Sequence, residues 1–239
     1  MTKLSVNINK IATLRNARGG ETPSVTEAAI KIQEFGAQGI TIHPRPDERH
    51  ITRKDVYDLK PLVTAEFNIE GNPHRPFIDM VLEVKPEQVT LVPDADDAIT
   101  SNAGWDTKRH LDFLTDIIAE FKNAGIRTSI FLDPMPELVE YAAKTGADRI
   151  ELYTEAYAKY YTSNKEQAIK PYYETAVVAA DFGLGLNAGH DLSLDNLKYF
   201  ADHIPNLLEV SIGHALISEA LYMGMENTVQ AYLKRLAKW

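Results

Sequence analysis

Two glycine–histidine pairs stand at the ends of short apolar runs. The first run, Leu184–Asp191, contains two glycines and closes on His190. The second, Val210–His214, closes on Gly213 and His214 and leads into a predicted helix. Glycine weakens a strand, so its presence here predicts that something approaches the backbone closely. We expect this to be a ligand. Backbone N–H groups at a helix start bind anions and histidine titrates near neutral pH, so the pairs predict a phosphate site with proton-transfer groups.

Other predicted loops are rich in the same kinds of residue. Segment Lys10–Gly20 supplies three cations, and His43–His50 combines histidine, arginine and carboxylates. Segment Asp94–Trp105 is long and polar, as expected of a lid that closes over a reaction. An exposed charged loop is the structural alternative for each segment. A histidine held by a backbone carbonyl is the alternative for each glycine–histidine pair.

Composition limits the class of protein. The chain has 239 residues, of which 44% are hydrophobic and 25% charged, as in ordinary globular proteins. There is no cysteine, which excludes disulfides and thiolate metal sites. A net charge of −9 argues against a general nucleic-acid binder, although a local cationic cluster can still bind small anions. No apolar run resembles a signal peptide or a membrane span, so a cytoplasmic protein without a membrane partner is expected.

Short β-rich runs alternate with amphipathic stretches along the whole chain. Strands are expected near Leu4–Asn9, Gly39–His43, Ala65–Glu70, Gln88–Val92, Arg127–Leu132, Arg149–Tyr153, Gly185–Ala188 and Leu208–Ile212. Helices are expected near Thr26–Phe35, Lys54–Leu62, Phe77–Val84, Thr107–Asn123, Pro136–Thr145, Lys165–Phe182, Leu194–His203 and Ile217–Leu236. Eight such units predict an α/β protein with one domain over residues 1–239, a TIM (β/α)₈ barrel. A doubly wound open sheet is the rival, but its glycine-rich loop after the first strand is missing.

Alternation along the predicted strands separates apolar from polar residues. In the first strand, Leu4 and Val6 share one face while Ser5 and Asn7 share the other. The polar face recurs in other strands with Thr41, His43, Glu66, Asn68, Glu70, Glu151, Tyr153, Glu209 and Ser211. In a barrel the apolar face meets the helices, so the polar set points inward. These inward groups either satisfy one another as a structural polar core or line a reaction chamber.

Several blocks resemble the pyridoxine 5′-phosphate synthase family of the vitamin B6 pathway. The resemblance spans nearly the whole chain. Its longest block runs from Ile11 to Arg18, and shorter blocks are Val6–Ile8, Gly39–His43, Arg49–Thr52, Asn68–Glu70, Leu91–Pro93, Asn187–His190 and Ile212–Ala215.

The resemblance implies a barrel enzyme that condenses 3-amino-2-oxopropyl phosphate with 1-deoxy-D-xylulose 5-phosphate. Pyridoxine 5′-phosphate forms with loss of phosphate and water, without metal or organic cofactor. The family also implies a homo-octamer in which Arg18 could serve a neighbouring subunit. Matching positions would make His43 and Glu70 proton acceptors and His190 a proton donor. Other matches would bind the aminoketone phosphate through Asn7, Arg18, Asp191, Gly213 and His214, and deoxyxylulose phosphate through Arg45, His50 and Thr100.

The chain departs from the family at a few positions. Asn9 and Lys10 stand where much of the family has Asp-His, and Lys10 keeps a cationic donor for deoxyxylulose phosphate. Asp191 replaces a usual glycine. Two rivals remain open: another phosphosugar isomerase or aldolase, and a non-catalytic phosphometabolite-binding barrel. The protonation of His43 is also open, because an ionised Glu70 would raise its pKa and burial would lower it.

Overall fold

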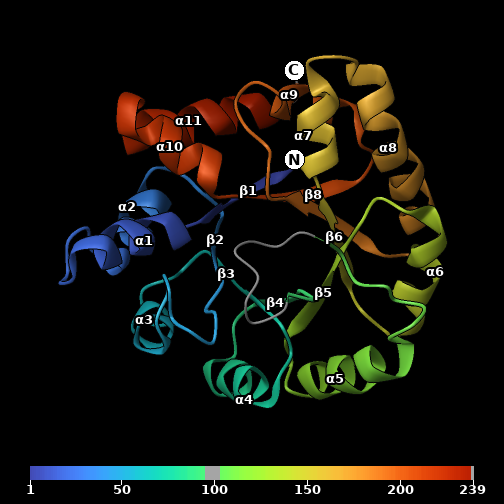
Figure 1. Cartoon of the computed structure of the whole chain (residues 1–239), viewed down its shortest axis with the longest axis horizontal. Coiled ribbons are helices and arrows are strands. Elements are labelled where there is room, and N and C mark those ends of the chain that lie inside the picture. The colour runs from blue at the N-terminus through green and yellow to red at the C-terminus, as the bar shows by residue number, and fades with distance from the viewer. Residues whose placement is uncertain (95–102, 238–239) are drawn as a thin grey trace.

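Eight parallel strands close into a barrel within residues 1–94 and 103–237, the part of the chain that this computed structural model describes. Neighbours in the sequence are neighbours in the barrel, and β8 pairs with β1 (Figure 1). The strands are β1 (Lys3–Asn7), β2 (Gly39–Ile42), β3 (Glu66–Gly71), β4 (Gln88–Leu91), β5 (Arg127–Leu132), β6 (Arg149–Tyr153), β7 (Gly185–Gly189) and β8 (Leu207–Ile212). The predicted barrel is confirmed, and the open-sheet rival is excluded.

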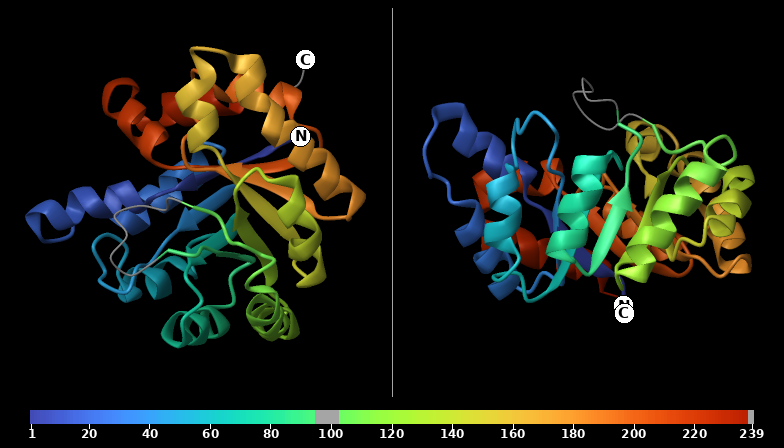
Figure 2. Two further views of the ribbon diagram at one scale, coloured as in Figure 1. Left: turned by 45° about the vertical axis from the view of Figure 1, so that its right-hand side comes forward. Right: turned by 90° about the horizontal axis from the view of Figure 1, so that it is seen from below.

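Helices surround the barrel and cover its apolar outer face (Figure 1). They are α1 (Asn9–Arg18), α2 (Val25–Glu34), α3 (Arg53–Leu59), α4 (Arg75–Val84), α5 (Leu111–Asn123), α6 (Pro136–Lys144), α7 (Glu155–Tyr161), α8 (Lys165–Asp181), α9 (Leu197–His203), α10 (His214–Met223) and α11 (Met225–Leu236). Figure 2 shows the N-terminus at one face of the barrel and the βα loops at the opposite face.

Local sequence signals explain many of the helix ends. Ser24 accepts a hydrogen bond from the Glu27 N–H and caps α2, and Thr52 and Asp55 form a reciprocal capping box at α3. Gly36, Gly125 and Gly146 have positive φ angles and end the helices before β2, β5 and β6.

Three helices differ from the sequence prediction. Segment Lys10–Gly20 was expected to be a loop, but α1 occupies most of it and projects away from the barrel (Figure 2). Helix α7 follows β6, where Tyr157 is buried against aromatic residues of α8 and α9. The predicted helix Ile217–Leu236 is divided at Gly224, whose φ of 79° suits glycine, into α10 and α11.

The barrel interior is polar and its outer face is apolar, as the alternation predicts. Leu4 and Val6 are fully buried in the layer between strands and helices. Inside, Ser5 lies 2.7 Å from the Thr41 hydroxyl, and Asn68 bonds both Thr41 and Thr90. This layer of the interior is therefore a structural hydrogen-bonded network beneath the strand ends.

At the two glycines of β7, any larger side chain would collide with neighbouring protein atoms. A Cβ atom at Gly185 would lie 2.7 Å from Cγ of Arg149. A Cβ at Gly189 would lie 2.6 Å from both Oε1 of Glu151 and the carbonyl oxygen of Ser211. The expectation that a ligand requires these glycines is therefore wrong, because neighbouring barrel residues already fill the space.

Candidate active site

A cavity of about 410 Å³ lies at the carboxyl ends of the strands. This is the face at which parallel barrels bind ligands. The residues that line it are Asn7, Asn9, Lys10, His43, Arg45, His50, Glu70, Val92, Phe131, Glu151, His190, Asp191, Ser211, Gly213 and His214. Most of the predicted site residues are therefore brought together, although they come from distant parts of the sequence.

A histidine–carboxylate pair lies in the cavity wall. His43 follows β2 and Glu70 is in β3, and Nδ1 of His43 lies 4.0 Å from Oε2 of Glu70. Asn7 donates to the same oxygen over 3.4 Å, and Ser211 donates to Oε1 over 3.5 Å. Strands β1 and β8 therefore hold the Glu70 carboxyl between them.

Burial controls the protonation of this pair. Burial, aided by the charge of Asp94, raises the pKa of Glu70 to about 8. Burial and the nearby cation Arg45 hold the pKa of His43 well below its usual value. The question left open by the sequence is answered, because burial dominates the shift of the His43 pKa. These directions favour a protonated Glu70 carboxyl beside a neutral His43 imidazole, which can accept a proton.

Asn7 and Asn9 join the ends of two strands. The Asn7 Oδ1 atom accepts from the Asn9 N–H at 3.0 Å, and Asn9 Oδ1 accepts from the His43 N–H, also at 3.0 Å. The Asn9 side chain thereby fixes the backbone that carries the His43 imidazole. Lys10, the next residue, is exposed at the mouth of the cavity.

Arg45 and His50 place hydrogen-bond donors suited to an anion on one side of the cavity. Arg45 is buried and pairs with Asp94 at 2.5 Å, and Asn72 donates to the Asp94 carbonyl. The Nδ1 atom of His50 accepts from the Ile51 N–H at 2.9 Å, so a neutral His50 carries its proton on Nε2. Burial and the nearby Arg45 lower the pKa of His50 to about 4. A phosphate here would meet a guanidinium and an imidazole N–H donor.

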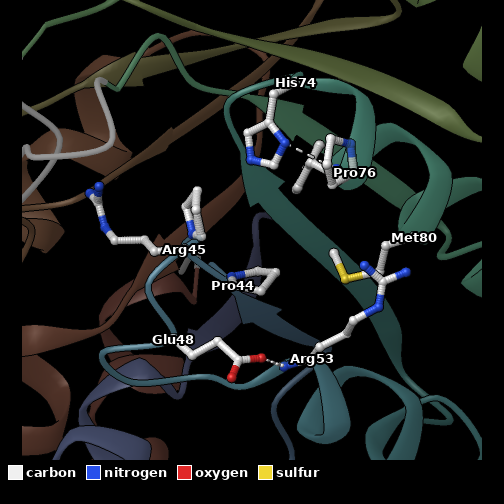
Figure 3. A pocket seen from close by; sticks show the side chains of 9 residues that line it. Pro44, Arg45, Glu48, Arg53, His74, Pro76 and Met80 are labelled. Carbon is white, nitrogen blue, oxygen red and sulfur yellow. Dashed lines mark hydrogen bonds between the residues drawn. The ribbon is translucent and has the colours of Figure 1, made fainter.

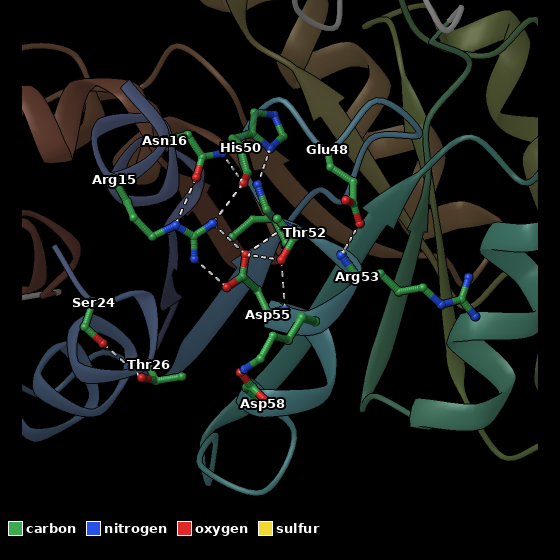
Figure 4. Close-up of polar contacts among 12 residues, drawn as sticks. Arg15, Asn16, Ser24, Thr26, Glu48, His50, Thr52, Arg53, Asp55 and Asp58 are labelled. Atoms are coloured by element: carbon green, nitrogen blue, oxygen red, sulfur yellow. Dashed lines mark hydrogen bonds and ion pairs between the residues drawn. The ribbon is translucent and has the colours of Figure 1, made fainter. Parts of the chain in front are cut away.

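A network behind His50 fixes its backbone (Figure 4). Arg15 of α1 forms a two-pronged ion pair with Asp55 of α3, at 2.5 and 2.8 Å. The same guanidinium donates to the His50 carbonyl at 3.2 Å, and Asn16 donates to it at 2.8 Å. The sequence predicted Arg15 only as one of three cations in a loop. Its position on helix α1 instead directs its side chain toward Asp55 of α3.

His190 is held in an uncommon backbone conformation. Its φ is 97°, a region that non-glycine residues rarely adopt. The Nδ1 atom lies 2.6 Å from Oδ2 of Asp191, and the ring packs edge-on against Tyr153 at 5.1 Å. The Asp191 N–H donates to Thr154, which also bonds the Gly189 carbonyl at 2.8 Å. Asn196 donates to the Asp191 carbonyl at 3.2 Å, so the backbone of Asp191 is held on both sides while its carboxylate orients the histidine.

The N-terminus of α10 faces the cavity from the end of β8. Gly213 precedes the helix and His214 is its first residue. A Cβ at Gly213 would lie 3.1 Å from the Asn7 Cβ, so glycine permits the close approach of β1. Free N–H groups in the first turn of a helix attract anions. The start of α10 is therefore a second candidate phosphate site, formed by a different chain segment from the one that carries Arg45.

Among the described residues, one predicted site residue is not in the cavity wall. Arg18 is exposed at the far end of α1 and does not line the cavity of its own chain. Thr100, and most of the predicted lid Asp94–Trp105, lie outside the described residues. Glu151, by contrast, was predicted only to point inward, yet it lines the cavity floor. Burial and the charge of Glu70 hold its pKa well above the usual range.

A further cavity, of about 450 Å³, lies on the outer side of the loop that carries Arg45 (Figure 3). Its walls include three prolines, and Arg53 and His74 border it. Glu48 accepts from the Arg53 N–H at 2.7 Å, which ties this loop to α3.

In the described part of the chain, no group of three or more histidine or carboxylate side chains is placed to hold a metal ion. None of the helices described there is long and apolar enough to cross a membrane.

Comparisons with solved structures show the same barrel in proteins of different sequence. The chain resembles a tryptophan synthase from M. tuberculosis with a TM-score of 0.66, at 11% identity, over 100% of this chain and 93% of the other. It resembles a thiamine phosphate pyrophosphorylase from Pyrococcus furiosus with a TM-score of 0.62, at 15% identity, over 98% and 95%. At such low identity these similarities support the fold alone.

Comparisons of sequence identify the family. The model of the pyridoxal phosphate biosynthesis protein PdxJ matches residues 4–238. A pyridoxine 5′-phosphate synthase of Christiangramia forsetii is 65% identical over 99% of this chain and 100% of its own. One from Phocaeicola vulgatus is 66% identical over 97% and 98%. The chain therefore belongs to the PdxJ family of pyridoxal phosphate biosynthesis proteins, a family of enzymes.

Proposed function

We propose that this enzyme condenses 3-amino-2-oxopropyl phosphate with 1-deoxy-D-xylulose 5-phosphate to form pyridoxine 5′-phosphate. One observation carries the proposal: His43, Glu70 and His190 share a cavity with two separate groups suited to phosphate. A phosphosugar isomerase or aldolase that handles one phosphate does not require both groups. The names of the curated relatives support the same product.

The phosphate groups of the two substrates are assigned to two different segments of the chain. Arg45 and His50 bind the phosphate of the deoxyketose, which leaves, with Lys10 at the mouth as a further cation. Gly213 and His214, at the start of α10, bind the phosphate that the product retains. No metal or organic cofactor takes part in this proposal.

Proton transfer is divided among the three catalytic residues. Imine formation, enolisation and ring closure each require a proton to move. Neutral His43 accepts a proton, and His190, oriented by Asp191, donates one to a leaving oxygen. Glu70 starts protonated, and a cationic amine or iminium beside it would lower its pKa and convert it into a base. Glu70 therefore becomes an acceptor only when the substrate nitrogen is in place.

The test is direct turnover by the purified chain. With both phosphates present, the pyridinol product should appear by its absorbance, with one inorganic phosphate released per product. The matched control is Glu70→Gln, which keeps the shape of the side chain and should lower turnover by about 10²–10⁴-fold. Binding of both phosphates without product would instead identify a metabolite-binding barrel.

We also propose, from the family resemblance, a homo-octamer in which Arg18 reaches the site of a neighbouring subunit. Mixing Arg18→Ala with His43→Asn subunits would then restore part of the activity that each variant lacks. Mixtures that stay as inactive as the separate variants would place Arg18 outside any shared site.

A further inference from the structure

The cavity wall is polar almost everywhere. Val92 and Phe131 carry the only apolar side chains among the described residues that line it. Together with Tyr153 they form a cluster separate from the main core, here named the apolar ledge. The three side chains are 2%, 4% and 8% exposed, so a small ligand group can cover what remains.

The ledge interrupts an otherwise polar pattern. Thr90 and Ser129, which are paired in register on β4 and β5, are the inward residues one step below Val92 and Phe131. Only at the carboxyl ends of these adjacent strands do the inward residues become apolar. The rings of Phe131 and Tyr153 lie 5.2 Å apart, and Tyr153 continues the surface to His190. Tyr153 therefore connects the apolar part of the cavity wall, Val92 and Phe131, to the proposed proton donor.

We infer that the apolar ledge receives the methyl group of the deoxyketose phosphate and selects against ketose phosphates that carry a hydroxyl there. This inference rests on the proposed function. Of the two proposed substrates, only the deoxyketose has a methyl group; their other substituents are phosphate, hydroxyl, carbonyl or amine groups. The methyl is bonded to the carbonyl carbon that condenses with the amine. Binding it against the ledge directs that carbon into the cavity, toward His190.

The same placement determines specificity. A hydroxymethyl group in place of the methyl would bring a hydroxyl against the apolar side chains of Val92 and Phe131, where it loses water without gaining a partner. An apolar pocket rejects an added hydroxyl by about 10²-fold. Xylulose 5-phosphate, which differs from the deoxyketose only in that hydroxyl, is therefore expected to have a kcat/KM about 10²-fold lower.

The experiment compares both ketose phosphates in wild-type protein and in Val92→Thr. Threonine has nearly the same volume as valine but adds a hydroxyl to the ledge. The ratio of the two kcat/KM values should fall about 10-fold, because one new hydrogen-bond partner removes much of the penalty. The KM for 3-amino-2-oxopropyl phosphate should stay unchanged. Val89→Thr is the control, because Val89 lies on the same strand but in the core beneath the helices.

A second variant, Phe131→Leu, tests the ledge if Val92→Thr does not fold. It narrows the apolar surface and should lower kcat/KM for the deoxyketose more than for xylulose 5-phosphate. A selectivity ratio equal to that of wild type in a folded, active variant would overturn the ledge and leave the proposed function standing. Wild-type protein that forms no product from the two proposed substrates would overturn both.

Discussion

The Nδ1 atom of His190 lies 2.6 Å from the Oδ2 atom of Asp191, the next residue in the chain. Adjacent residues can meet in this way because His190 has a φ of 97° and the Asp191 N–H is fixed by Thr154. The carboxylate contacts the ring through Nδ1 and thereby fixes the direction in which the imidazole points. The residue that follows the proposed proton donor thus gives it a carboxylate partner.

Asp191→Asn is expected to lower kcat on the order of 10-fold, because a neutral amide orients the imidazole less strictly than a carboxylate. The KM for both substrates should change little. Steady-state kinetics with each substrate varied in turn measures the two effects. Asp195→Asn, an exposed position in the same loop, is the control. A rise in KM for the aminoketone phosphate with kcat unchanged would place Asp191 at the phosphate instead.

Glu70→Gln is expected to change the pH dependence of stability as well as turnover. The pKa of Glu70 is raised from 4.5 to about 8, so the folded state favours the protonated acid. Its stabilising contribution is complete below pH 4.5 and is lost as the pH rises toward 8, on the order of 1 kcal/mol per pH unit. Chemical denaturation between pH 5 and 8 should therefore show a weaker decline for the variant.

Glu209→Gln is the matched control for that experiment. Burial and the charge of Glu66 also raise the pKa of Glu209 to about 8, but Glu209 pairs in register with Lys3 at the amino end of the barrel. The variant should likewise weaken the decline in stability while keeping near wild-type turnover. Equal loss of turnover in both variants would mean that Glu70 acts through the barrel's stability rather than on the substrate.

Arg45→Met should raise the KM for deoxyxylulose phosphate by about 10–100-fold, since a hydrogen bond to a charged group contributes about 1.5–3 kcal/mol. It should also destabilise the fold by about 3–5 kcal/mol, because the guanidinium no longer neutralises the buried Asp94. Adding Asp94→Asn should restore stability but not KM. Affinity for pyridoxine 5′-phosphate should change less than that KM; equal losses would show that the two phosphates share one site.

Asp55→Asn should raise the KM for deoxyxylulose phosphate several-fold by releasing Arg15 from the His50 carbonyl (Figure 4). In a His50→Ala background the same change should have no further effect on KM, because the network would act only through that imidazole. Asp58→Asn, which removes an exposed ion pair with Lys54 on the same helix, is the control. Additive effects of Asp55→Asn and His50→Ala would mean that the network only stabilises the fold.

The sequence determined the barrel, because local periodicity encodes the eight strands and most of the helices between them. Alternation in β1 placed Leu4 against the helices and Ser5 inside the barrel. It also indicated the groups that line the cavity, since parallel strands bring their carboxyl ends to one face. Its helix boundaries failed at α1, where polar and charged residues gave no apolar stripe to recognise.

Only the tertiary structure decided how these residues are charged and what they contact. The pKa shifts of His43 and Glu70 depend mainly on burial inside the barrel, and that of Glu70 also on the charge of Asp94, which follows the next strand of the barrel. Gly189 must be glycine because a side chain there would collide with Glu151 of the neighbouring strand, a contact that exists only in the folded barrel. Desolvation and steric contact depend on which atoms are close in space. Many of those atoms belong to other strands, so a local stretch of sequence does not reveal them.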